Sequence, residues 1–170
     1  MIENNYYSQF TDFDIELFKA GKHYLLYNHI GAHVINKNGT TGVYFSVWAP
    51  NARYVSVIGN FNSWNRGSHQ MNVRWDQSGI WELFVPGLQS AEYYKYYVEG
   101  NNGYMVEKAD PYAYHSEMPP ATASVTWDLS YKWGDRKWLQ QRDKQHVLTT
   151  PLSIYELHLG SWRRKDDGRV

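Results

Sequence analysis

Two short stretches of the sequence combine aromatic rings with polar side chains in a way that suits sugar binding. In "EYYKYYVEG", the two-residue period of a strand would place Tyr93, Lys95 and Tyr97 together on one face. The turn "IGNFNSWN" has the same make-up, because Trp64 there has Asn62 close by in the sequence. A sugar can lay its flat C–H face on such rings while lysine and asparagine bind its hydroxyls. These residues fit carbohydrate binding, and they also fit packing against another domain.

The acidic residues do not form a catalytic pair in the sequence. Cleavage of a glycosidic bond needs two carboxyl groups, one acting as the acid and the other as the base or nucleophile. The acidic side chains lie mostly in predicted turns or at helix starts, where we expect structural roles: Asp12, Asp14, Glu16, Asp76, Asp110 and Asp128. The sequence has no cysteine, no serine in a nucleophile elbow and no phosphate-binding glycine loop. We therefore expect no active site and no enzymatic activity in this chain.

Two histidines have a spacing that can bind a metal ion. His29 and His33 are four residues apart, so a helix would present both imidazoles to one ion. Gly31 lies between them and disfavours a helix, and no third ligand is evident from the sequence. We therefore expect no metal site, and nothing in the sequence predicts a cofactor.

The composition favours a globular protein with aromatic side chains on its surface. The 170 residues include 8 Trp, 15 Tyr and 6 Phe, more large rings than a core of this size needs. The 17 basic and 17 acidic residues are scattered, which gives no cationic patch for nucleic acid or for an anionic membrane. No apolar run reaches the roughly 20 residues of a membrane-spanning helix, and "MIENNYYSQF" lacks the features of a secretory signal. The expected location is the cytoplasm, with neither nucleic acid nor membrane as a partner.

The residue pattern predicts an all-β protein, an immunoglobulin-like antiparallel β-sandwich with a short N-terminal helical segment. "TDFDIELFKAG" favours a helix, because Thr11 can cap it and Gly21 can end it. From residue 40 onward, alternating apolar residues indicate strands, and Asn38-Gly39 is predicted as a turn. The loops "DQSG" and "NNG" each separate two such runs and predict two hairpins. Regularly spaced short strands of this kind are typical of a sandwich.

The expected organisation has four regions. Residues 1–39 form the helical segment, 40–128 the sandwich, 129–150 a polar linker, and 151–170 the beginning of a further domain. The last region contains "SIYELHLGSW", which predicts a strand with apolar residues on both faces.

Several stretches together are characteristic of one enzyme family. They are "FKAGKHYLLYNHIGAHV", "GVYFSVWAPNARYVSVIGNFNSWNRGSHQM", "GIWELFVPGL", "YYKYYVEGNNGYMVEKADPYA", "TASVTWD" and "SIYELHLGSWRR". Over nearly the whole chain they resemble the N-terminal part of bacterial glycogen branching enzymes, which are 1,4-α-glucan branching enzymes of glycoside hydrolase family 13. Within them, "FSVWAPNARYVSVIGNFNSWN" is similar to carbohydrate-binding module family 48, a β-sandwich also found in isoamylases and in the glycogen-binding subunit of an AMP-activated kinase. "SIYELHLGSW" resembles the first strand of the catalytic (β/α)₈ barrel.

The resemblance implies a full-length parent that cleaves α-1,4 glucan and transfers the chain to a 6-hydroxyl, making the branches of glycogen. The catalytic carboxylates of the family lie on later barrel strands, so no residue here carries over as catalytic. For sugar binding, the resemblance to the kinase-type module reaches Trp64 and Lys95, and the second tryptophan of that module falls near Tyr104. The implied partners are α-1,4-glucan or glycogen and the missing barrel. The alternative is a structural spacer that packs against the barrel and has little sugar affinity.

Overall fold

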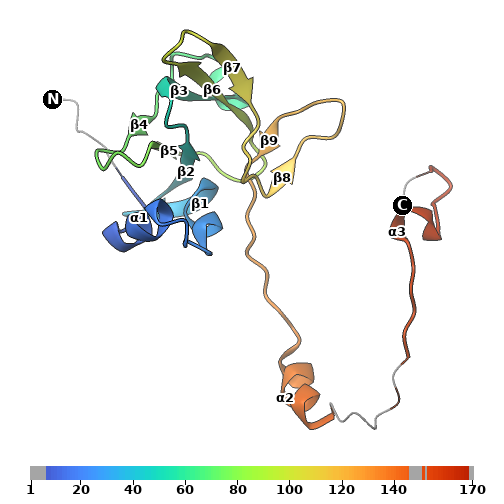
Figure 1. Ribbon diagram of the computed structural model, residues 1–170. Coiled ribbons are helices and arrows are strands. Elements are labelled where there is room, and N and C mark those ends of the chain that lie inside the picture. Colours follow the sequence, from blue (N-terminus) through green and yellow to red (C-terminus); the bar gives the residue numbers. More distant parts are fainter. Residues whose placement is uncertain (1–6, 146–150, 152, 169–170) are drawn as a thin grey trace. The chain divides into compact units, whose positions relative to one another are not determined.

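The computed structural model describes residues 7–145, 151 and 153–168 (Figure 1). Its elements in chain order are α1 (Asp12–Lys19), the 3₁₀ turn η1 (Leu26–Asn28), β1 (Gly31–Lys37), β2 (Thr40–Trp48), β3 (Ala52–Gly59), the 3₁₀ turn η2 (Asn60–Asn62), β4 (Asn72–Val73), β5 (Ile80–Pro86), β6 (Tyr93–Gly100), β7 (Met105–Lys108), β8 (His115–Ser116), β9 (Ser124–Val125), α2 (Arg136–Gln145) and α3 (Leu159–Trp162). They fall into two compact units that divide between Leu129 and Ser130. Within the described ranges, no helix combines the length and the apolar content that crossing a membrane requires.

The first unit is an immunoglobulin-like antiparallel β-sandwich. One sheet has the strand order β1-β2-β5-β4, and the other has the order β3-β6-β9-β8, with β7 also paired to β6. The predicted all-β fold is confirmed. Both predicted hairpins are confirmed as well, because β4 pairs with β5 and β6 pairs with β7.

The core of the sandwich is built from the inward-facing residues of both sheets. Val43, Phe45 and Val47 of β2 belong to the same buried cluster as Tyr94 and Tyr96 of β6. Burying a side chain of this size contributes about 1.5 to 3 kcal/mol, so this layer holds the two sheets together. The alternation read from the sequence therefore corresponds to real inward and outward faces.

The N-terminal segment covers the outer face of the first sheet, and Figure 1 shows α1 lying beside that sheet. Phe10, Ile15 and Ile30 form a second buried apolar cluster with Ile80 of β5. Glu82, two residues further along β5, is also buried, with 1% of its surface exposed. The middle of the first sheet, at β2 and β5, is thus buried on both faces, and polar side chains on its outer face there lie inside the protein.

The N-terminal region contains a strand that the sequence prediction missed. The predicted helix is confirmed as α1, where Thr11 and Asp14 form a reciprocal capping box. Residues 31–37, however, form β1, which pairs with β2 from Gly31–Ser46 to Lys37–Thr40. The expectation of a helical segment up to residue 39 is wrong here. The predicted Asn38-Gly39 turn closes the β1–β2 hairpin, and an Asn-Gly turn should have indicated a strand on each side of it.

The expected first barrel strand is not formed in the second unit. Residues 153–158 have no regular secondary structure, and Leu159–Trp162 form the short helix α3. This corrects the prediction of a strand over "SIYELHLGSW". A strand needs neighbouring strands for its backbone hydrogen bonds, and the described residues of this unit contain no strand. Its apolar side chains are instead exposed, with Ile154 at 82% and Tyr155 at 68%.

We expect the backbone amides of residues 154–158 to exchange with deuterium orders of magnitude faster than those of Val43 to Val47. The β2 amides belong to a strand paired on both sides, whereas residues 154–158 have no such pairing. Hydrogen exchange followed by NMR on dilute protein measures both sets in one sample. Equal protection of the two sets, independent of protein concentration, would show that residues 154–158 have an intramolecular partner.

Candidate functional site

A loop after β3 places Trp64 at one end of the second sheet. β3 ends at Gly59, and η2 leads into Ser63 and Trp64, which have positive φ angles of 53° and 58°. The backbone N of Trp64 donates a hydrogen bond to the Gly59 carbonyl oxygen at 2.9 Å. A Cβ atom at Gly59 would lie 2.2 Å from the carbonyl oxygen of Tyr93, so only glycine allows this close approach. The loop is therefore held against the start of β6.

Asn62 supports this loop from within. Its Oδ1 accepts a hydrogen bond from the Gly59 backbone N at 2.9 Å. Its Nδ2 donates to the Val57 carbonyl oxygen and lies 2.9 Å from Nδ1 of His69. Burial lowers the pKa of His69, which favours the neutral ring whose Nδ1 can accept this bond. The amide of Asn62 is thus used inside the protein.

The Trp64 ring is partly exposed and is fixed in orientation. The residue is 37% exposed, and its Nε1 donates to Oδ1 of Asn60 at 3.1 Å. Asn60 lies in the same turn, so the loop itself orients the ring. One hydrogen bond of this kind limits rotation of the ring while part of its surface remains accessible.

Tyr93 and Lys95 of β6 lie at the same end of the sheet as Trp64. Ile58, the penultimate residue of β3, pairs directly with Lys95. Tyr93 is 36% exposed, and Nζ of Lys95 donates to Oγ1 of Thr122 at 2.8 Å. Thr122 lies in a loop without a sequence pattern, so sequence reasoning gave no signal for it. Trp64, Tyr93 and Lys95 are called the Trp64 surface below.

Tyr97 faces the same side but is covered by the chain itself. Its exposed fraction is 4%, and the Arg66 guanidinium lies over its ring, with Cζ 4.8 Å from the ring centroid. Nη2 of Arg66 also forms an ion pair of 2.6 Å with Oε1 of Glu107 on β7. The expectation of an open face is therefore wrong at Tyr97, because the loop that carries Trp64 continues over this ring.

Tyr104 lies at the other end of β6. Its carbonyl oxygen accepts a hydrogen bond from the Gly100 backbone N at 2.8 Å. Lys95 and Gly100 are separated by about 17 Å along the strand, at about 3.3 Å per residue. Tyr104 is 63% exposed and lines a surface hollow of about 610 Å³. Its polar neighbours in that hollow are Asn51, Asn101 and Asn102. The structure does not bring Tyr104 to the Trp64 surface.

Glu82 belongs to a buried ion pair. Its Oε2 lies 3.1 Å from Nη1 of Arg74, and the side chains of both residues are 1% exposed. Oε1 of Glu82 accepts hydrogen bonds from the Tyr44 hydroxyl and, at 2.6 Å, from Oγ of Ser8. Burial and the neighbouring Glu82 charge raise the pKa of Tyr44, which keeps it protonated as a donor. Glu82 therefore has a structural role.

Asp110 is the buried acceptor of a second polar network. Its Oδ2 accepts hydrogen bonds from the hydroxyls of Tyr94 at 2.6 Å and Tyr96 at 3.2 Å. Its Oδ1 accepts from the backbone N of Tyr112 at 2.8 Å. Burial raises the pKa of the Asp110 carboxyl, although these hydrogen bonds oppose the shift. The prediction that Asp110 is structural agrees with this geometry.

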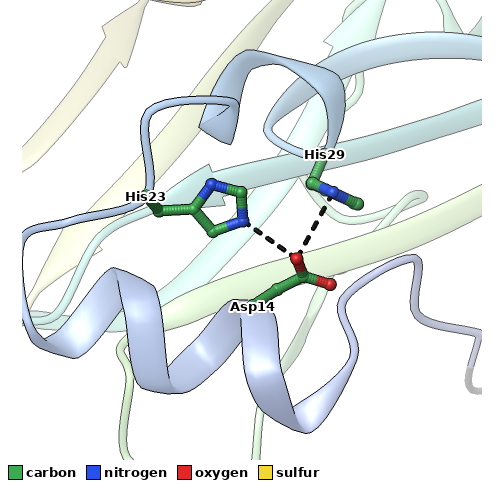
Figure 2. Close-up of side chains that lie close together, drawn as sticks. All are labelled: Asp14, His23 and His29. Atoms are coloured by element: carbon green, nitrogen blue, oxygen red, sulfur yellow. Dashed lines mark hydrogen bonds and ion pairs between the residues drawn. The ribbon is translucent and has the colours of Figure 1, made fainter.

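Asp14, His23 and His29 converge at the N-terminal segment (Figure 2). Oδ1 of Asp14 lies 3.0 Å from Nε2 of His23 and 3.7 Å from Nε2 of His29. The side chains are 14%, 6% and 24% exposed, in that order. Burial raises the pKa of Asp14, but hydrogen bonds from Thr11 and His23 outweigh it and hold this pKa below its ordinary value. Sequence reasoning missed the cluster, because no helical or strand period connects positions 14, 23 and 29.

His33, the predicted neighbour of His29 on a helix, belongs to β1 instead. Its Nε2 lies 3.0 Å from the Ile30 carbonyl oxygen, and its ring packs edge-on against Tyr114. The helical spacing considered for these two histidines does not exist.

Comparisons with known proteins point to one family. The sequence pattern of carbohydrate-binding module 48 (Isoamylase N-terminal domain) matches residues 29–113, half of the chain. The chain is 53% identical over 153 residues to the 1,4-alpha-glucan branching enzyme GlgB of Thermosynechococcus vestitus. This alignment covers 89% of this chain and 20% of that enzyme. The chain is 47% identical over 158 residues to the enzyme of the same name from Aquifex aeolicus, covering 93% of this chain and 25% of that enzyme.

A solved structure supports the fold. The pullulanase of Anoxybacillus sp. LM18-11, crystallised with maltotetraose, matches 76% of this chain and 16% of its own, with a TM-score of 0.50 and 22% identity. This likeness concerns the fold alone. The chain spans about a fifth to a quarter of the length of the curated relatives given above.

Proposed function

The chain belongs to the carbohydrate-binding module 48 family, and we propose that it binds α-1,4-glucan, such as glycogen, at the Trp64 surface. The observation that carries the proposal is a partly exposed tryptophan whose ring is oriented by Asn60 and which lies at the same end of the sheet as Lys95. The ring offers a face for the C–H side of a glucose unit, and Lys95 can donate to its hydroxyls. Tyr93 extends the aromatic platform.

The other three expected contact residues have different roles in this proposal. Asn62 positions the loop, because its amide is used by Gly59 and Val57. Tyr97 packs against the Arg66 guanidinium, which covers its ring, and does not contact the sugar. Tyr104 belongs to the separate hollow at the far end of β6.

For the whole protein, we propose an N-terminal region of a bacterial 1,4-α-glucan branching enzyme, with residues 151–170 leading into its catalytic barrel. The full-length enzyme would cleave α-1,4 glucan and transfer the chain to make α-1,6 branches in glycogen. The identity of about 50% to enzymes of that name over about 90% of this chain supports this proposal. The chain itself would bind glucan without cleaving it.

A spacer role is the alternative, and one observation favours it. Large rings are also exposed away from the second sheet, on and near the N-terminal segment that covers the first sheet: Phe13, Tyr24 and Trp75. Rings gathered there suit packing against a further domain. In that case the Trp64 surface would have little affinity for sugar.

We expect Trp64→Ala to weaken binding of maltoheptaose by about 1 to 3 kcal/mol, or about 5- to 150-fold in Kd, as for other exposed aromatic anchors. Lys95→Ala should have a smaller effect in the same direction, because Lys95 contributes hydrogen bonds and not the stacking face. NMR titration of the chain with maltoheptaose measures both.

Tyr104→Ala is the matched control, since it removes an exposed ring at the other end of the same strand. The Tyr104→Ala variant should bind maltoheptaose with the same Kd as the unaltered chain. Absence of any shift with millimolar maltoheptaose would support the spacer role and reject glucan binding. If Trp64→Ala instead lowers the free energy of unfolding by about 3 to 5 kcal/mol, the ring belongs to the core.

A further inference from the structure

We propose that Asp14, His23 and His29 form a binding site for a divalent transition-metal ion, with Zn²⁺ as the expected occupant. Two imidazole nitrogens and one carboxylate oxygen lie within 4.8 Å of one another at this place. The proposal departs from the sequence expectation of no metal site, which considered His29 only together with His33.

The geometry of the three side chains suits a tetrahedral ion. Zinc binds histidine nitrogen and carboxylate oxygen at about 2.0 to 2.2 Å, which places neighbouring ligand atoms about 3.3 Å apart. The two separations from Oδ1 of Asp14 are 3.0 Å to His23 and 3.7 Å to His29, so they bracket this value. Figure 2 shows the His23 ring directed at Oδ1 of Asp14, and the His29 ring seen nearly edge-on with its nitrogen above the same oxygen. To bind an ion among them, the His29 ring would turn so that the lone pair of its Nε2 lies in line with the ion.

Surrounding hydrogen bonds hold two of the ligands in the required state. Nδ1 of His29 lies 3.1 Å from the Gln9 carbonyl oxygen, which can only accept. The ring proton is therefore on Nδ1, and Nε2 keeps its lone pair for the ion. Oδ2 of Asp14 accepts from the Thr11 backbone N at 2.8 Å and from its hydroxyl at 2.6 Å, which leaves Oδ1 directed at the site.

One buried polar atom of the cluster has no hydrogen-bond partner. The His23 side chain is 6% exposed, and its Nδ1 is buried without a hydrogen-bond partner. If Nε2 donates to Asp14, then Nδ1 is a buried acceptor with no donor, which is an unusual arrangement. With a metal ion on Nε2 the ring proton would be on Nδ1, a buried donor, so this unpaired atom does not distinguish a metal site from an ion pair.

The chemistry of the ligands selects the class of ion. Imidazole nitrogen suits zinc, copper and nickel, whereas calcium and magnesium prefer sites made of oxygen. The partly exposed side of His29 leaves room for a water molecule as the fourth ligand. The ligands come from α1, from the turn after Gly21 and from the end of η1, so a bound ion would fasten α1 to the chain that leads into β1. The expected role is structural.

The test uses metal salts alone, added to protein stripped with a chelator. Zn²⁺ at 100 times its Kd should raise the melting temperature by about 5 to 10 °C for a chain of this length. Co²⁺ should give the visible absorption of a four-coordinate site, which Zn²⁺ abolishes by displacement. His29→Gln should weaken Zn²⁺ binding at least about 10-fold, because it removes one of three protein ligands.

His115→Gln is the control, because it removes an exposed histidine of the same unit that is not in the cluster. This variant should bind Zn²⁺ as tightly as the unaltered chain. The melting temperature of His29→Gln with chelator present shows whether that variant is folded, and a folded variant that binds Zn²⁺ with unchanged affinity overturns the proposal. An unaltered chain that shows neither the temperature shift nor the Co²⁺ spectrum also overturns it, leaving an ion pair at the helix cap.

Discussion

Replacement of Arg74 by methionine should lower the free energy of unfolding by about 3 to 5 kcal/mol, the usual cost of removing one partner of a buried ion pair. Nη1 of Arg74 lies 3.1 Å from Oε2 of Glu82, and both side chains are 1% exposed. Without the guanidinium, the Glu82 carboxylate stays buried and uncompensated beneath the N-terminal segment. Urea unfolding at neutral pH measures the loss.

Two further variants test the cause of this loss. Arg53→Met removes the cation of a surface pair with Glu99, where the Arg53 side chain is 56% exposed, and should cost at most about 1 kcal/mol. The double variant Arg74→Met/Glu82→Gln should recover only part of the loss, because it removes the buried Glu82 charge but leaves Asp76, which lies 2.7 Å from Nε of Arg74, without its partner. If Arg74→Met costs no more than Arg53→Met, then the buried pair is not formed in solution.

Asp110→Ala should lower the free energy of unfolding by about 2 to 5 kcal/mol. It leaves the hydroxyl of Tyr94 and the backbone N of Tyr112 without their acceptor, while the Tyr96 hydroxyl keeps the Ser46 carbonyl oxygen at 3.2 Å, and each unsatisfied buried donor costs about 1 to 3 kcal/mol. Tyr94→Phe, which removes one donor and leaves the acceptor, should cost less. Equal losses for the two variants would show that the carboxylate is not the centre of the network.

The same carboxyl group also predicts a pH dependence. Burial raises the folded-state pKa of Asp110 above its ordinary value of 3.8. Above pH 3.8 the unfolded chain therefore releases this proton before the folded chain does, and the stability contributed by Asp110 falls as pH rises through the folded-state pKa. Relative to Asp110→Asn, which does not titrate here, the unaltered chain should lose stability over this window. A difference that stays constant, or that grows with pH, would contradict the raised pKa.

The sandwich could be predicted from the sequence because its inward faces alternate strictly, as in Val43, Phe45 and Val47. β1 was missed because it is an edge strand that follows a helical turn, and its polar His33 and Asn36 weaken the alternation. No sequence pattern marks Glu82 as a buried residue. It is buried because the N-terminal segment covers that face, which only tertiary packing decides.

The Trp64 surface was predicted in part, for a similar reason. The turn and strand patterns placed Tyr93 and Lys95 on one strand face, but they did not predict that Trp64 lies at the same end of the sheet. They could not show that Arg66 folds back over Tyr97, because that contact depends on the ion pair with Glu107 on another strand. A local pattern gives the face on which a residue lies, but not what covers that face.

The N-terminal cover sets the size of the piece that could be transplanted into another protein. The family pattern begins at residue 29, whereas Phe10 and Ile15 lie before it and pack on Ile80, and Ser8 binds Glu82. A graft trimmed to residues 29–113 would uncover an apolar strip and a charged pair on one side of the sheet, a surface that favours self-association. The transferable unit is therefore larger than the unit of sequence similarity, and a graft of this scaffold should begin no later than residue 7.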